Sequence, residues 1–266
     1  VSGKGSTGCL GLMRMSTKEQ ERRLWELVNV RKENVRCMLS NEAANFGALA
    51  ENYEPMPKIK HVSAGINHTV FLAEDNSVWV CGKNNNLELG MLDFHDRWVP
   101  TKLKLDEALS ESGGQTLNPG EHVVQISAGN MHTAVLTNQG RVVTWGMNRH
   151  GQCGVSHHMA LYNDSKYLRE NLARTAFPTP PSFVQIDTSL AADSSSVQPK
   201  IDKIFSGFYD TFMLTEQGHL IRVGAGIDGG EDVNSCPDRQ YLEAEGLSVS
   251  EVASGWKHVV VIGQKK

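Results

Sequence analysis

Three histidines at repeated positions are the residues in this chain best suited to metal binding. His68, His132 and His258 each stand three positions after a glycine. Imidazole nitrogens ligate zinc, but every ligand must lie within ~2.1 Å of the ion. Because each histidine recurs in a similar sequence context, we expect the three to occupy separate copies of one repeated unit. We therefore predict a structural role for each, with the ring hydrogen-bonded to backbone inside its own unit.

A glycine motif near the first residue has the form of a cofactor site. Gly3, Gly5 and Gly8 spell G-x-G-x-x-G, the dinucleotide fingerprint, which needs a strand before it and a helix after it. The same glycines recur further along in a repeated loop without that context. The acidic, glycine-rich residues 224–232 lack the D-x-D-x-D-G order of a calcium loop. With no nucleophile elbow or phosphate-binding loop either, we predict no catalytic, cofactor-binding or metal-binding residues and no enzyme activity.

Composition restricts the class of protein. The chain has 266 residues, 39% of them hydrophobic, which is enough for a sizeable core. A net charge of -4 gives no reason to expect direct contact with nucleic acid, and no apolar run approaches the ~18 residues that span a bilayer. The five cysteines form no C-x-x-C pair, which favours a reducing, intracellular location in cytoplasm or nucleus. We expect Cys81 and Cys153 to be small buried thiols.

A unit of constant internal spacing repeats along the chain. Within it, two glycines stand 17 positions apart, as Gly129 and Gly146 do, and a third glycine follows 8 positions later. Connectors of unequal length join the units, as in repeated modules that carry loop insertions. The predicted units are residues 62–90, 123–154 and 201–230, with a split unit made of residues 249–266 plus 1–12.

Each unit contains two short strands joined by a tight turn. In the second unit, residues 133–137 and 141–145 are apolar or alternate in polarity over the length of a strand. Gly140 lies between them and is free to adopt a positive φ, as the hairpin turn requires. Asn76 is predicted to take the same conformation in the first unit. We expect Trp145 to fill the core of its unit.

These units resemble the regulator of chromosome condensation repeat, a family that forms β-propellers. The matching segments are A-G-x-x-H-T, L-T-x-x-G-x-V and W-G-x-N-x-x-G-Q-x-G, which residues 126–154 carry almost completely. The first unit has Cys81 in place of Trp145, and the third has Asp210 in place of the histidine and Val223 in place of the tryptophan. The resemblance implies an all-β propeller, with short helical insertions between its units.

We expect one propeller domain over residues 1–266. The first twelve residues repeat the back half of a unit and the last twelve the front half, so the two ends could complete one blade and close a four-bladed ring. The alternative, left open, is a segment of a larger, seven-bladed propeller like others in the family.

Segments that are not part of the repeat are inserted between the units. We predict a helical insertion at residues 15–40 and two connectors, residues 91–121 and 155–198. Within the connectors we expect an edge strand at Trp98–Pro100, a surface loop over 110–121, a short helix over 164–173, an outer strand over 183–186 and a serine-rich stretch over 187–199.

The predicted function is binding to other proteins. A propeller presents its loops on two rims, and binding sites concentrate in loops, so we expect a non-catalytic scaffold or adaptor that uses rim loops and insertions. The founding member of the family that the units resemble is a guanine-nucleotide exchange factor for a small GTPase. The resemblance therefore implies two alternatives, an exchange factor for a small GTPase or the targeting module of a larger enzyme such as a ubiquitin ligase or a kinase.

Overall fold

The computed structural model describes residues 56–113, 115–155, 178–186, 198–224, 240–242, 247–255 and 258–265. The predicted half-unit at residues 1–12, the helical insertion at 15–40 and the helix over 164–173 lie outside the described residues. So do almost all of the serine-rich stretch and residues 225–232.

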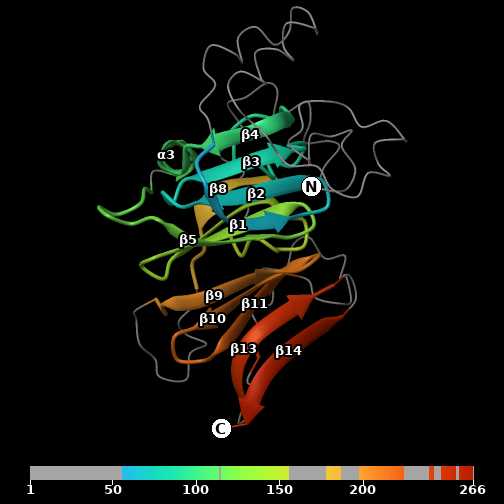
Figure 1. The fold of residues 1–266 in the computed structure, drawn as a ribbon. Coiled ribbons are helices and arrows are strands. Elements are labelled where there is room, and N and C mark those ends of the chain that lie inside the picture. The colour runs from blue at the N-terminus through green and yellow to red at the C-terminus, as the bar shows by residue number, and fades with distance from the viewer. Residues whose placement is uncertain are drawn as a thin grey trace, which may run out of the picture.

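Three antiparallel sheets of four strands and one two-stranded hairpin follow one another along the chain (Figure 1). Blade 1 contains β1 (Ile59–Ala64), β2 (His68–Ala73), β3 (Val78–Gly82) and β4 (Arg97–Leu103). Blade 2 contains β5 (Val123–Ala128), β6 (His132–Thr137), β7 (Val142–Met147) and β8 (Pro178–Phe183). Blade 3 contains β9 (Ile201–Ser206), β10 (Asp210–Thr215), β11 (Leu220–Gly224) and β12 (Gln240–Leu242). The terminal hairpin contains β13 (Leu247–Ser254) and β14 (Val259–Lys265).

Successive blades pack face to face through their inner strands. Strand β5 contacts β1 and β2 of the blade before it, β9 contacts β5 and β6, and β13 contacts β9. A cluster of buried hydrophobic side chains fills each junction, with Leu72, Ile126 and Trp145 in the first of them. The predicted all-β propeller architecture is confirmed, while the number of blades and the closing of the ring stay predictions.

The turns within the blades are those that the sequence predicts. Asn76, Gly140 and Gly218 occupy the β2–β3, β6–β7 and β10–β11 turns with φ values of 67°, 76° and 85°. A positive φ is costly for most residues but not for glycine, and asparagine tolerates it better than other side chains. We call the edge of the blades that carries these turns the turn rim, and the opposite edge, with residues 83–96 and 148–155, the loop rim.

Two predictions in the connectors are wrong. The outer strand of blade 2 is β8 (Pro178–Phe183), not residues 183–186. Its three prolines argue against a strand in the middle of a sheet, but an outer strand needs hydrogen-bond donors on one side alone. The predicted loop over 110–121 begins inside a helix, α3 (Leu105–Gly113), which buries Leu105 and Leu109 and packs against β8. The edge strand predicted at Trp98–Pro100 is confirmed as part of β4.

Candidate functional site

The repeated histidines join neighbouring blades. His68 begins β2, and its Nε2 lies 2.9 Å from Oγ1 of Thr133 in blade 2. His132 begins β6, and its Nε2 lies 3.0 Å from Oγ1 of Thr211 in blade 3. The structural role predicted for these residues holds, but the predicted partner is wrong, because each ring bonds a hydroxyl of the next blade instead of backbone in its own.

The threonine hydroxyls extend each histidine contact into a chain of hydrogen bonds. Thr133 donates to the backbone oxygen of Glu88 over 2.9 Å, and Thr211 donates to that of Gln152 over 2.8 Å. A hydroxyl that donates its one hydrogen to a carbonyl must accept from the histidine. The imidazole therefore carries a proton on Nε2. At each of these hydroxyls two blades meet, together with a loop of the earlier blade on the loop rim.

Burial keeps both imidazoles uncharged. It lowers the pKa of His68 to about 4 and, with a contribution from His68, that of His132 to about 3. An unfolded histidine titrates near 6.5, so below that pH the unfolded chain takes up protons that the folded chain refuses. Stability must then decrease with falling pH.

We expect the melting temperature to reflect this titration. The contribution of His68 and His132 is constant above pH 6.5 and declines between pH 6.5 and 4. Melting curves across that range, compared with those of the His68→Gln/His132→Gln variant, isolate the effect. The variant should lose much of the pH dependence seen in the parent. Equal slopes for the two proteins would contradict the assignment of neutral buried rings.

The third junction uses different chemistry at the same positions. Asp210 replaces the histidine, and Val259 of the terminal hairpin has no hydroxyl to offer. The carboxylate instead accepts from Arg222 at 3.0 Å and from Ser254 of the hairpin at 3.2 Å. Burial raises the pKa of Asp210, and the Arg222 guanidinium opposes that shift. Asp210 thus has a polar structural role at this junction.

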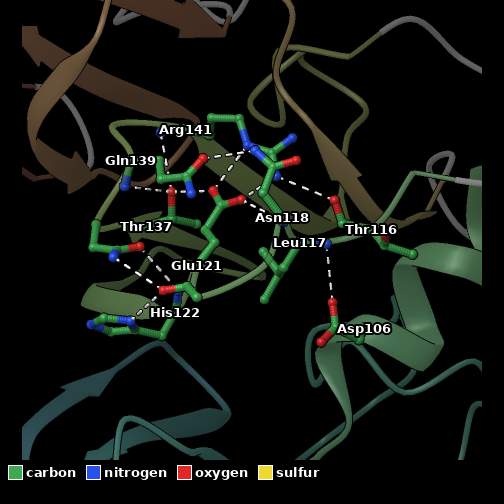
Figure 2. A network of polar contacts seen from close by, with 11 residues as sticks. Asp106, Thr116, Leu117, Asn118, Glu121, His122, Thr137, Gln139 and Arg141 are labelled. Atoms are coloured by element: carbon green, nitrogen blue, oxygen red, sulfur yellow. Dashed lines mark hydrogen bonds and ion pairs between the residues drawn. The ribbon is translucent and has the colours of Figure 1, made fainter.

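A second polar network fixes the connector on the turn rim of blade 2 (Figure 2). The side chain of Glu121 is fully buried and pairs with Arg141, which directly precedes β7. It also accepts from the Thr137 hydroxyl at 2.6 Å and from the Asn118 amide at 2.8 Å. Burial would raise the pKa of Glu121, but these hydrogen bonds and the Arg141 charge outweigh it and hold the pKa below its usual value.

The same network reaches helix α3. The Arg141 guanidinium stacks 3.9 Å above the Phe183 ring of β8, and it donates to the backbone oxygen of Thr116. The amide of Leu117 donates to Asp106 in the first turn of α3 (Figure 2). Residues 115–122 are therefore attached to the helix at one end and to the β6–β7 turn at the other. This part of the connector is an ordered element of the rim.

The described residues give little support for a small-molecule binding site. A cavity of about 180 Å³ lies between α3 and β8, smaller than the ~300 Å³ at which ligand pockets begin. No ionisable side chain lines it; it is bordered by Leu109, Ser112, Gly113, Gln115, Gly154, Val155, Pro181, Ser182, Phe183 and Gln185. Within the part of the chain that the structure describes, no cluster of three metal-ligating side chains occurs and no helix is long and apolar enough to span a membrane. His258 is exposed on the terminal hairpin.

Comparison with known proteins identifies the repeat. Two family models, both described as the regulator of chromosome condensation (RCC1) repeat, match the chain, one at residues 59–87 and 123–152 and the other at 75–136. Residues 59–152 therefore carry the regulator of chromosome condensation repeat. The matched segments coincide with the inner strands, turns and loops of blades 1 and 2. The resemblance inferred from the glycine spacing is confirmed.

Proteins with different names are similar to this chain in sequence. The ultraviolet-B receptor UVR8 of Arabidopsis thaliana is 27% identical over 199 residues, which cover 74% of this chain and 36% of the relative. The regulator of chromosome condensation of Mus musculus is 28% identical over 174 residues, 64% of this chain and 36% of the relative. The chain thus spans about a third of these relatives.

Solved propellers share the fold. Prp20p from Saccharomyces cerevisiae has a TM-score of 0.60 at 17% identity, with 100% of this chain covered and 51% of that one. Human WBSCR16 has a TM-score of 0.53 at 19% identity, with 79% and 46% covered. Identities this low support the architecture alone.

Several of these contacts were not predicted from the sequence. Thr133 directly follows the histidine of its unit, and Thr211 directly follows the aspartate of its unit, so the pattern is visible in the sequence. The hydrogen bonds of both threonines reach the previous blade, and the spacing of residues does not reveal these partners. Glu121 and Arg141 stand 20 positions apart in a connector and a turn, and nothing in the repeat marks them as a pair.

Proposed function

We propose that this chain is a non-catalytic protein-binding module whose partner contacts the turn rim through the connector of blade 1. The observation that carries the proposal is the ordered connector at residues 105–113 and 115–122. Glu121 and Arg141 bond its backbone at Asn118 and Thr116, and α3 packs on β8 while the opposite face of the helix is exposed. The polar side chains of the repeats themselves are engaged in holding blades together.

The exposed face of α3 gives the proposed surface its character. Glu107 and Glu111 lie on it one helical turn apart, and both are exposed. Glu107 pairs with Lys104 over 3.1 Å, but both side chains are largely in solvent, where such a pair contributes little. A rigid helix with exposed carboxylates favours a partner with basic residues, because charge complementarity speeds association and selects partners.

The test is affinity purification with mass spectrometry on matched variants. Glu107→Lys/Glu111→Lys should lose the partners that the parent chain retains. Glu74→Lys/Glu216→Lys makes the same charge change on exposed turn-rim positions outside α3 and should retain them. Deletions of residues 15–40 and 156–177 test the two other insertions, and the second deletion keeps β8, on which blade 2 and α3 depend. Partners that survive the α3 change and both deletions would contradict binding through insertions.

A second candidate function is guanine-nucleotide exchange. A relative in Saccharomyces cerevisiae is named guanine nucleotide exchange factor SRM1, and it is 24% identical over 77% of this chain and 39% of its own length. Nucleotide release from a panel of small GTPases tests this candidate. Clear acceleration of nucleotide release would favour the exchange factor over the scaffold. Unchanged nucleotide release would favour the non-catalytic binding module.

A third candidate is the targeting module of a larger enzyme. A human relative named probable E3 ubiquitin-protein ligase HERC3 is 28% identical over 76% of this chain but only 16% of its own length. Full-length transcripts that encode a catalytic domain in the same reading frame would support this candidate. In all three cases we expect an intracellular location, cytoplasmic or nuclear, without direct contact to nucleic acid.

A further inference from the structure

The cavity between α3 and β8 has walls that favour an apolar occupant. Leu109 of the helix and Phe183 of the strand line it and are 2% and 7% exposed. Ser112 and Ser182 line it too, but each donates its hydroxyl hydrogen to a backbone oxygen of its own helix or strand. None of the residues that line the cavity is ionisable. A buried polar group without a hydrogen-bond partner is unfavourable, so an apolar group suits these walls best.

The volume of the cavity corresponds to one side chain. It measures about 180 Å³, and a cavity of ~150 Å³ lined by apolar side chains accepts a benzene molecule. A phenyl ring therefore fits, whereas a drug-sized ligand does not. An aromatic occupant also gains the contact with the Phe183 ring, because aromatic pairs contribute beyond the area that they bury.

Two exposed glutamines border the same cavity. Gln115 follows α3 and Gln185 follows β8. A side-chain amide offers both a donor and an acceptor, which match the N–H and C=O groups of an extended peptide. The cavity thus combines an apolar interior for one side chain with amides for the backbone that carries it.

The connector beside the cavity is acidic. Residues 104–122 contain four acidic side chains and one lysine. Arg141 pairs with one of the acids, which leaves an excess of two negative charges. Asp106 and Glu111 of α3 are both exposed. An occupant with basic residues next to its apolar side chain would complement this charge.

We propose that this cavity holds one aromatic side chain of the partner protein, presented on an extended peptide with neighbouring basic residues. The inference rests on the proposed function, because it names the chemistry of the partner at the same connector. The aromatic side chain anchors the contact, as buried aromatic residues do at other protein interfaces. The walls are formed in advance, since β8 pairs with β7 and Leu109 belongs to the core between blades 1 and 2. Binding therefore requires little ordering of the cavity.

The experiment titrates a synthetic peptide into the chain and follows methyl resonances by NMR. The probe is acetyl-Lys-Ser-Phe-Ser-Lys-amide, and a second peptide has alanine in place of phenylalanine. The phenylalanine peptide should shift the methyl signals of Leu109 and Val155 until saturation and leave those of Leu214, buried in blade 3, unchanged. Burial of a phenyl ring corresponds to roughly 10–100-fold in affinity, so the alanine peptide should bind more weakly by that factor. Equal binding of the two peptides would overturn the proposal.

Two variants close the cavity. Gln115→Trp and Gln185→Trp each place a large side chain at its border and should abolish the peptide-induced shifts. Both positions are exposed, so the changes leave the core intact. The matched control is Gln217→Trp, at an exposed position of the β10–β11 turn, which should bind the peptide as the parent does.

A third peptide tests the charge of the partner. Glutamate in place of both lysines should weaken binding at low ionic strength, and the difference should shrink at high ionic strength because salt screens exposed charges. A glutamate peptide that binds as tightly as the lysine peptide would overturn the basic character of the partner.

The outcomes separate this inference from the proposed function. Peptide binding that survives both tryptophan variants would overturn the inference alone. So would partners that are lost with Glu107→Lys/Glu111→Lys but retained with Gln115→Trp and Gln185→Trp, since α3 would then bind them without the cavity. Peptide binding only after deletion of residues 156–177 would make that segment of the chain the occupant and would also overturn the proposal.

Discussion

Replacing Trp145 with alanine should lower the free energy of unfolding by about 3–5 kcal/mol, the range for large core aromatics. The indole is fully buried in the cluster between blades 1 and 2. It packs on Gly90 of blade 1, where a Cβ would come within 2.9 Å of the ring. Its Nε1 donates to the backbone oxygen of Glu88 over 2.8 Å. The alanine variant loses a large side chain from this junction and the hydrogen bond to Glu88.

Denaturant titration measures this loss, and Trp145→Phe separates its two components. Phenylalanine retains much of the packing but cannot donate to Glu88. The carbonyl keeps its bond from Thr133, so we expect a cost of about 1 kcal/mol for the missing hydrogen bond plus a small loss of area. Trp98→Ala, on the partly exposed outer strand of blade 1, should cost less than Trp145→Ala. An unchanged unfolding free energy for Trp145→Ala would mean that the junction does not depend on this side chain.

The second large effect is expected for Gly129→Ala. An added Cβ would lie 2.1 Å from Cε1 of His132 and 2.7 Å from the backbone oxygen of Gly207. The His132 ring is held by Thr211, and the Gly207 carbonyl is held by its blade. Moving either group away from the added Cβ would therefore cost free energy. Forcing atoms into a packed core costs typically 1–3 kcal/mol and occasionally more. We expect the upper part of that range, because backbone of two blades is involved.

Two further variants make the glycine prediction specific. Gly113→Ala adds the same methyl group in α3, where nothing lies within 4 Å, and it should be neutral or slightly stabilising. Gly129→Ala/His132→Ala removes the nearest clash and leaves the contact with Gly207. The double variant should therefore cost less than the sum of the two single changes. Strict additivity would show that the glycine is required for a reason other than the histidine ring.

The repeat could be predicted because its signals are local. A hairpin turn needs a residue that tolerates positive φ, which marks Asn76 and Gly140, and strands need a few apolar residues on each side. The glycine three positions before each histidine is required by the ring that packs on it, so that spacing survives in every unit. The buried thiols of Cys81 and Cys153 are likewise confirmed, because each replaces or follows a core position of the repeat.

The connectors were harder to predict from the sequence because their structure depends on the strands that pack against them. Strand β8 contains three prolines and forms only because β7 offers it an outer edge. Helix α3 has two serines and a glycine near its C-terminal end. Its apolar face is explained by β8, a strand more than 60 positions further along the chain.

The sequence by itself determined the repeat, its turns and the propeller class, because these depend on contacts within about 30 residues. Only the tertiary structure decided what the repeated polar residues do. His68 and His132 bond threonines of the next blade, 65 and 79 positions away, and Glu121 is held by Arg141 across a turn. Such pairs depend on how blades stack, and a spacing rule within one unit carries no information about the distance to the next.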